Sequence, residues 1–309
     1  MSKKILFFGN ERLATGVTTG ALVLRGLIED GYEVAAVVVA QVEAGASRQP
    51  RQLEVAKLAG QHDIPVLALE NLAESVGQLS GLGAEAAVLV AYGKLVPPEL
   101  IEAFPHGIIN VHPSLLPKYR GSTPLESVIL DGANETGVSL MALAAEMDAG
   151  PVFAQQKVAL SGSETKQELA DKLSGIGAEM VRSNLSAILD GALEPQPQSG
   201  QPSFCQQIEK ANGEIDWNKP ATSLEREVRA YAGWPRSRSK IAGTDIVITA
   251  SHVIDGQGEP SKLWRQGKEF GIYTSDGIIV IDRLIPAGKK EMSAEAFLAG
   301  YQLNEVGGD

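Results

Sequence analysis

Cysteine is nearly missing from the chain: Cys205 is the only one among 309 residues. A single cysteine cannot form an internal disulfide bond, and this scarcity is typical of proteins that work in a reducing compartment. The sequence also lacks an apolar run of the roughly 20 residues that a membrane-spanning helix needs. The apolar run at residues 5–8 is too short for the core of a signal sequence. We therefore expect a cytoplasmic protein with no membrane contact.

Two nucleotide-binding fingerprints and the common metal motifs are missing as well. The first glycine turn, between Gly9 and Gly16, carries neither Gly-x-Gly-x-x-Gly nor Gly-x-x-x-x-Gly-Lys-Ser/Thr. Their absence counts against a nicotinamide dehydrogenase and against a P-loop enzyme. No His-Glu-x-x-His motif and no cysteine pair points to metal or covalent thiol chemistry. The sequence therefore favours a reaction that uses no metal.

Basic residues are outnumbered by acidic ones, which gives a formal net charge of −11. Such a charge argues against broad affinity for nucleic acids. Basic residues do gather between positions 219 and 240, where Arg226 and Arg229 lie, and an acidic protein can bind RNA through one local basic surface. The same residues can also form the solvated face of a helix. Charge alone leaves both interpretations open.

Apolar strands alternate with helical segments in the first part of the chain. Strands are expected at 4–8, 34–40, 66–69, 86–91, 107–111, 138–143 and 152–159. Helices are expected from the first glycine turn to about residue 30, at 51–61, 72–80, 97–103 and 124–131, and from the capping box Thr165-x-x-Glu168 to residue 190. The alternation is typical of βαβ units, which build a parallel sheet covered on both faces. We predict a Rossmann-like, doubly wound, mostly parallel sheet.

The last third of the chain has a different texture. Residues 192–206 contain prolines and no apolar periodicity, which indicates an extended linker between a domain at 1–191 and a domain at 207–309. After one helix at 221–231, short strands are expected at 246–250, 270–274 and 278–284, the last two joined by a Ser-Asp-Gly hairpin turn. A small, strand-rich, antiparallel domain predicts a compact OB-like β-barrel.

The stretch 107–124 combines a buried strand with a polar loop. Asn110 and His112 are two residues apart, so their side chains point to the same side of an extended chain, and Pro113 favours that extended conformation at His112. An amide donor and an imidazole thus lie side by side where a parallel strand meets solvent, which is where open α/β sheets bind ligands. Taken singly, such an asparagine is more often a turn former and such a histidine more often structural.

The pattern Asn110-x-His112-x-Ser-Leu-Leu-Pro, followed by Tyr-Arg-Gly, resembles the folate-dependent formyltransferases over nearly the whole chain. These enzymes transfer a formyl group from 10-formyltetrahydrofolate to an amine. The resemblance extends to residues 146–150, where the aspartate and glycine of the family's loop are kept as Asp148 and Gly150. In this chemistry Asn110 can donate to the formyl oxygen, His112 can shuttle a proton and Asp148 can hold the imidazole. Asp148 can meet His112 if two strands of one sheet end together.

The resemblance also implies which residues bind the donor. In the family, the segment matching 88–96 lines the pterin pocket and the segment matching Ser-Leu-Leu-Pro contacts the folate. The donor-binding residues expected here are Tyr92, Gly93, Leu95, Val96, Ser114, Leu115, Leu116 and Pro117. Apolar walls with a few backbone partners suit a flat heterocycle. Without the resemblance, 88–96 reads equally well as a strand end followed by the start of a helix.

Two C-terminal segments, residues 213–235 and 286–292, are similar to the family members that formylate the α-amino group of methionine on initiator Met-tRNA for translation initiation. This implies tRNA contacts by Arg48, Arg51, Arg226, Arg229, Lys289 and Lys290, and we expect a monomer. The chain departs from these members at 41–52, where a long basic insertion is replaced by a short loop with two arginines. It also has Asn10-Glu11 in place of Thr-Pro. Formylation of a sugar-nucleotide amine, or non-catalytic binding of tRNA or folate, are the alternative functions.

Overall fold

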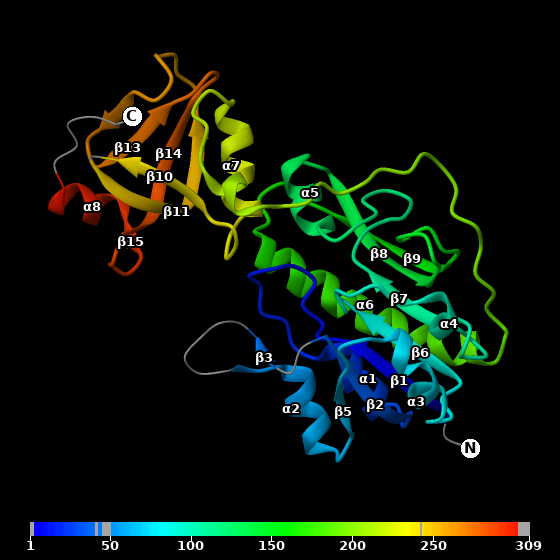
Figure 1. The fold of residues 1–309 in the computed structure, drawn as a ribbon. Helices are drawn as coiled ribbons and strands as arrows, with labels where there is room; N and C mark the ends of the chain where they lie inside the picture. Colours follow the sequence, from blue (N-terminus) through cyan, green and yellow to red (C-terminus); the bar gives the residue numbers. More distant parts are fainter. Residues whose placement is uncertain (1–2, 41–42, 45–50, 242, 302–309) are drawn as a thin grey trace. The chain divides into compact units, whose positions relative to one another are not determined.

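The computed structural model describes residues 3–40, 43–44, 51–241 and 243–301, with the side chains of 43–44 and 51–52 left out. The chain forms two compact units, traced by colour along the sequence in Figure 1. The first unit comprises the chain up to residue 125 together with 134–160 and 168–206. The second comprises 126–133, 161–167 and the chain from 207 onward. The second unit thus includes two segments that lie before the expected domain boundary at 191.

The first unit is built on a seven-stranded sheet with the order β5-β2-β1-β6-β7-β8-β9. Its strands are β1 (Lys4–Gly9), β2 (Glu33–Val39), β5 (Val66–Ala68), β6 (Ala86–Val90), β7 (Ile108–His112), β8 (Glu135–Ala142) and β9 (Val152–Ala159). The neighbouring strands from β5 to β7 pair in parallel, whereas β8 runs antiparallel to β7 and β9 antiparallel to β8. The predicted Rossmann-like, mostly parallel sheet is confirmed.

Helices supply the layers on this sheet. In the first unit they are α1 (Leu22–Glu29), α2 (Glu54–Gln61), the 3-10 turn η1 (Ala73–Ser75), α3 (Val76–Ser80), α4 (Pro98–Ile101) and most of α6 (Lys166–Leu189), whereas most of α5 (Pro124–Leu130) belongs to the second unit. Helix α1 begins at Leu22 and not directly after the glycine turn as expected, because Glu11 and Gly16 take left-handed backbone angles and residues 10–21 form a loop. Helix α2 also begins later than expected, at Glu54, because 51–52 form strand β4 (Arg51–Gln52), paired with β3 (Glu43–Ala44).

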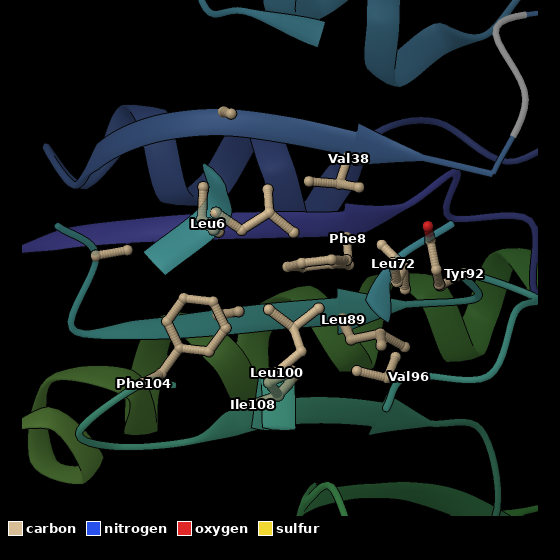
Figure 2. Close-up of a cluster of buried hydrophobic side chains, with 14 residues drawn as sticks. Leu6, Phe8, Val38, Leu72, Leu89, Tyr92, Val96, Leu100, Phe104 and Ile108 are labelled. Carbon is tan, nitrogen blue, oxygen red and sulfur yellow. The ribbon is translucent and has the colours of Figure 1, made fainter. Parts of the chain in front are cut away.

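The buried strands explain where the core sits. Leu6 and Phe8 of β1 lie on one face of the sheet with Val38 of β2 and Leu89 of β6, as period-two alternation requires. Figure 2 shows these side chains gathered with Leu100 and other residues that follow β6 in the chain. The residues between them in β1 are equally buried, because the sheet is covered on both faces. This rigid sheet fixes the ends of β1, β6 and β7, where the polar residues lie.

The second unit contains an antiparallel sheet with the order β10-β11-β14-β13-β12, and β15 pairs with β14. Its elements are η2 (Lys210–Gly213), α7 (Ala221–Ala230), β10 (Ser237–Ile241), β11 (Thr244–Ile254), β12 (Leu263–Gln266), β13 (Glu269–Tyr273), β14 (Ile278–Pro286), β15 (Met292–Ser293) and α8 (Ala294–Gly300). The predicted small antiparallel β domain is confirmed. Leu224 and Val228 of α7 enter one core with Phe270 and Phe297, the last from a helix that the sequence analysis did not predict.

Residues 192–206 do not behave as a free spacer. They belong to the first unit, and their backbone pairs with it at several points: Gln196 bridges to Val152, and Phe204 bridges to Arg120. The prolines still keep the segment extended, but its hydrogen bonds go to the first unit.

Within the described residues, no helix is long and apolar enough to cross a membrane.

Candidate active site

The C-terminal end of β7 presents two buried polar side chains to one cavity. Asn110 pairs with Leu89 of the parallel strand β6, and His112 pairs with Ser139 of the antiparallel strand β8. Both side chains line a cavity with a volume of about 620 Å³. The Asn110 amide makes no hydrogen bond to any described residue, so its N–H groups are free to serve a ligand. The predicted juxtaposition of amide and imidazole is present.

Ser139 fixes the loop that follows β7. Its hydroxyl donates to the carbonyl oxygen of Ser114 at 2.6 Å and accepts from the backbone N–H of Leu116 at 3.1 Å. The side chain of Gln155 adds a hydrogen bond to the same hydroxyl at 2.9 Å and another to the Leu116 carbonyl at 2.8 Å. These bonds join β7, β8 and β9, so the loop leaves the sheet in one defined direction.

His112 is held in one tautomer. Its Nε2 lies 3.0 Å from the backbone carbonyl oxygen of Tyr119. A carbonyl oxygen can only accept, so Nε2 carries the proton, and Nδ1 of the neutral ring presents a lone pair. That Nδ1 lies 3.7 Å from Oδ1 of Asp148, and both side chains are largely buried. His112 can therefore take up a proton at Nδ1 beside a carboxylate that stabilises the resulting imidazolium.

Asp148 reaches His112 by a different route from the one expected. Strand β8 runs antiparallel to β7, so its end at Ala142 lies beside Ile109 and not beside His112. The loop between β8 and β9 then carries Asp148 to the imidazole. There the Asp148 backbone is left-handed, with φ of 49°, and its Oδ2 accepts a hydrogen bond from the Gly121 N–H at 2.8 Å. The expectation that two strands end together was wrong, because antiparallel neighbours end on opposite sides.

The rest of the cavity comes from the loops after β1 and β6. Tyr92, Gly93, Leu95 and Val96 line it, and their predicted contact with the donor stays a prediction. Tyr92 packs edge-on against Phe8, and its buried hydroxyl has no hydrogen-bond partner among the described residues. Burial raises the pKa of Tyr92, so the phenol stays a neutral donor. Apolar walls such as these suit a flat heterocycle.

The other four predicted donor-binding residues do not line this cavity. Ser114, Leu115, Leu116 and Pro117 are absent from its wall. Ser114 is fully buried, and its hydroxyl donates to the Lys118 carbonyl at 2.7 Å. These residues shape the loop that carries Tyr119 to His112, and their direct contact with a folate stays a prediction.

Glu11 is a buried residue whose role the sequence did not indicate. Its carboxylate accepts hydrogen bonds from the N–H groups of Val23 at 3.0 Å and Leu24 at 2.9 Å, at the start of α1. Burial raises its pKa to about 7, although those backbone bonds act in the opposite direction. The side chain fixes the loop that bears Asn10 and Arg12, both of which line the cavity. A glutamate after a glycine turn gives no sequence signal that it is buried.

The predicted tRNA-binding residues fall into three groups. Arg48 and the side chain of Arg51 lie outside the described part of the structure. Arg229 is engaged within the second unit, where its guanidinium binds Glu225 at 2.6 and 2.9 Å and the Glu164 carbonyl at 2.9 Å. Arg226 packs against Gly132.

Lys289 and Lys290 are exposed in the turn after β14. Of the described candidates, these two lysines are the most accessible to phosphate.

Metal ligands do not gather in the described part of the chain: no three His, Cys, Asp or Glu side chains there are arranged to hold an ion. Besides Tyr92, the ionisable residues that line the cavity are Arg12, Lys94, His112 and Asp148. A cavity with two cations and one carboxylate, inside an acidic chain, suits an anionic ligand.

Comparison with known proteins gives family matches for most of the chain. Residues 3–184 match the formyl transferase family, and residues 207–302 match the formyl transferase C-terminal domain. The methionyl-tRNA formyltransferase of Thermodesulfovibrio yellowstonii is 32% identical over 99% of this chain and 98% of its own length. That of Pelobacter propionicus is 34% identical over 98% of this chain and 95% of its own length.

Among solved structures, the N-formyltransferase of Helicobacter canadensis, in complex with folinic acid and dTDP-3-aminofucose, superposes with a TM-score of 0.67. It is 20% identical, and the match covers 94% of this chain and all of the other. At this identity the likeness bears on the fold alone.

Proposed function

The chain belongs to the formyl transferase family, and from that premise we propose that it transfers a formyl group from 10-formyltetrahydrofolate to the α-amino group of methionine on initiator Met-tRNA. The product is formyl-Met-tRNA for translation initiation. The observation that carries the proposal is the convergence of Asn110, His112 and Asp148 on one cavity. Full-length relatives named for the same reaction support the choice of substrate.

Asn110 supplies the electrostatic part of the reaction. The amine attacks the formyl carbon, and the carbonyl oxygen becomes an oxyanion. The Asn110 amide has free N–H groups on the cavity wall, and it donates to that oxygen without any change of charge. A preorganised donor in a buried site stabilises the oxyanion more than water would, because the donor does not have to reorient.

His112 and Asp148 supply the proton path. The attacking nitrogen must lose one proton and the folate N10 must gain one as it leaves, so the transfer needs a relay and no net proton. The lone pair on Nδ1 of His112 takes the proton from the attacking nitrogen and returns it to N10. Asp148 stabilises the intermediate imidazolium from 3.7 Å, and the Nε2 contact with Tyr119 keeps the ring in place throughout.

The donor fits the wall formed by Tyr92, Gly93, Leu95 and Val96. The folate brings the activated formyl group, and the protein contributes apolar walls to hold the heterocycle. Arg12 and Lys94, also on the wall, are available for anionic groups of either substrate. The residues of Ser114 to Pro117 support this site through the Tyr119 loop.

The acceptor is the finer part of the proposal. The exposed Lys289-Lys290 turn in a separate β domain suits contact with a phosphate backbone, and the relatives that cover nearly the whole chain are named for Met-tRNA. A sugar-nucleotide amine is the second candidate, because an enzyme of the same fold was solved in complex with dTDP-3-aminofucose and the fold can therefore hold such a compound. We further expect the protein to act as a monomer in the cytoplasm, which sedimentation of the purified chain and localisation of a tagged copy would check.

A transfer assay tests the proposal. Purified protein is incubated with 10-formyltetrahydrofolate and one of three acceptors: charged initiator Met-tRNA, free methionine or a 4-amino-sugar nucleotide. Met-tRNA alone should be formylated, and Asn110→Ala should lower kcat by about 100- to 1000-fold, as loss of one oxyanion donor does elsewhere. Asn134→Ala, a change at an exposed asparagine, is the matched control. Formylation of the sugar would replace the acceptor assignment, and no transfer to any acceptor would refute the function.

A further inference from the structure

Residues 196–206, here called the strap, cross the two loops that build the active site. Gln196 exchanges two backbone hydrogen bonds of 2.8 Å with Val152, next to the loop of Asp148. Further along, Ser203 accepts from the N–H of Arg120 at 2.9 Å and donates its own N–H to the Pro117 carbonyl at 3.2 Å. The strap therefore contacts both the loop after β7 and the loop after β8. These two loops come from separate parts of the chain.

Gln198 is the point where the strap meets both loops through one side chain. Its Nε2 donates to the backbone carbonyls of Asp148 and Gly150, each at 2.8 Å. Its Oε1 accepts from Nη2 of Arg120 at 2.7 Å and from Nε at 3.2 Å. Both N–H groups and the oxygen of the amide are thus used. A fully satisfied side-chain amide has one low-energy orientation, so it can act as a rigid brace.

Gln198 binds Asp148, a residue with a strained backbone conformation. Asp148 has a left-handed φ of 49°, a conformation that costs a non-glycine residue roughly 1 kcal/mol or more. Such a conformation persists only when its surroundings hold it in place. Gln198 binds the carbonyl of Asp148 itself, while the neighbouring Gly121 N–H binds the carboxylate. The strap therefore holds the backbone of Asp148, and the loop after β7 holds its side chain.

Arg120 completes the connection. Its side chain is largely buried, lies 6.0 Å from the centre of the Phe204 ring of the strap and contacts Glu146 at 3.5 Å. It also stands between Tyr119, whose carbonyl binds His112, and Gly121, whose N–H binds Asp148. Through Arg120, a shift of Gln198 is transmitted to the backbone on both sides of the His112–Asp148 pair.

We propose that Gln198 is a positioning residue for formyl transfer, which holds Asp148 at the distance from His112 that the proton relay requires. The inference rests on the proposed function, and it assigns to the strap a part in turnover. Gln198 contacts no reacting atom. Its effect on rate passes through Asp148, and this gives the assignment a signature that a general loss of stability does not have.

Three variants separate the possibilities. Gln198→Ala removes every contact and should lower kcat about 10- to 100-fold, since small displacements of catalytic groups have effects of that size. The KM for the folate donor should stay within about twofold, because the donor wall does not include Gln198. Gln198→Glu keeps an acceptor for Arg120 but loses both donors to the Asp148 loop, so it should be at least as impaired. Gln201→Ala, an exposed residue of the same strap, should match the parent.

A double-mutant cycle tests the route through Asp148. In an Asp148→Asn background, Gln198→Ala should lower kcat by less than about twofold, because the group it positions is already lost. A full additional loss in that background would overturn the inference, as would parental kcat in both Gln198 variants.

A measurement that does not depend on catalysis tests the inference separately from the proposed function. Hydrogen exchange of the Gly121 amide reports whether Asp148 Oδ2 remains in place. In folded Gln198→Glu this amide should exchange at least about tenfold faster than in the parent, while amides of β1 keep their protection. Unchanged Gly121 protection would overturn the inference even if the chain proved inactive with every acceptor, an outcome that would count against the proposed function alone.

Discussion

The carboxylate of Asp148 is oriented by Gly121 and not by His112: the Gly121 N–H donates to Oδ2 at 2.8 Å, whereas Oδ1 lies 3.7 Å from the imidazole. The loop after β7 thus supplies both the Tyr119 carbonyl that fixes the histidine ring and the N–H that fixes the aspartate. Because one short stretch contacts both groups, its backbone geometry contributes to their separation together with the hydrogen bond from Gln198 to the Asp148 carbonyl.

Asp148→Asn should separate charge from geometry. The asparagine oxygen can still accept from Gly121, so the midpoint of thermal unfolding should change by no more than a few degrees. The negative charge beside His112 is lost, and kcat should fall about 100- to 10,000-fold, the typical contribution of general acid–base catalysis. Single-turnover transfer to Met-tRNA measures this. Near-parental turnover would show that Asp148 takes no part in proton transfer.

Glu11 should make the stability of the chain depend on pH. Its pKa is about 7 in the folded state against 4.5 as the ordinary value, so between these values the folded chain binds more protons than the unfolded chain. The free energy of unfolding should therefore fall as pH rises through this window, by up to about 3 kcal/mol. Urea unfolding at pH 5 and pH 8 measures the difference.

Glu11→Gln removes the titrating group and should reduce that difference. Glu54→Gln, at the exposed first residue of α2, is the matched control and should keep the parental pH dependence. A parental pH dependence in Glu11→Gln would contradict the assignment to Glu11.

Lys166 should be far more important for stability than an exposed lysine. Its Nζ, fully buried, binds Glu126 Oε1 at 3.2 Å and the Trp234 carbonyl at 2.8 Å. Lys166→Met leaves Glu126 buried without its cation, at a cost of about 3 to 5 kcal/mol. Lys157→Met breaks an exposed pair with Glu135 and should cost less than about 1 kcal/mol. Equal effects in denaturant unfolding would show that burial does not decide the strength of the pair.

Gly150 should not tolerate a side chain. A Cβ at this position would lie 1.9 Å from the carbonyl oxygen of Ala142, so the loop that carries Asp148 would have to move. Gly150→Ala should destabilise the fold by about 1 to 3 kcal/mol and lower kcat. Gly175→Ala, inside α6 with no atom within 4 Å of the added carbon, should stabilise the fold by up to about 1 kcal/mol. Parental stability and turnover in Gly150→Ala would refute the close approach.

The Lys289-Lys290 turn should act on tRNA affinity alone. Replacing both lysines with alanine should raise the KM for Met-tRNA and lower the slope of log affinity against log salt by about 1 to 2. The KM for the folate donor should not change. Arg229→Ala should instead lower stability, since its guanidinium is bound to Glu225 and the Glu164 carbonyl. Equal salt slopes in the double-lysine variant and the parent would exclude this turn from the tRNA contact.

Strands with continuous apolar runs could be predicted from the sequence. The run in β1 is buried on both faces, and the short stretch in β7 carries Asn110 and His112 to one cavity because alternation is a local property of an extended chain. Short or polar elements such as β10 and β15 were missed, because their sequences carry no strong periodicity and pairing with longer strands defines them.

Contacts between distant segments could not be predicted. The direction of β8 decides how Asp148 approaches His112, and a strand pattern reads the same in both directions. Glu11 and Gln198 look like ordinary polar loop residues, and their importance arises from backbone groups that lie far away in the chain. A side chain that binds a distant backbone atom gives no periodic pattern in the sequence, so periodicity cannot predict the contact.

The discontinuous second unit has a consequence for how the chain is made. Glu126 and Lys166 leave the ribosome long before Trp234, whose carbonyl completes the hydrogen bonds of Lys166. Until that residue has been synthesised, Lys166 lacks the carbonyl oxygen that accepts from its Nζ in the complete structure. The sheet of the first unit can form while translation continues. Segments 126–133 and 161–167 can pack into the second unit only after the chain from 207 onward has been synthesised. The last third of synthesis therefore sets when this protein finishes folding.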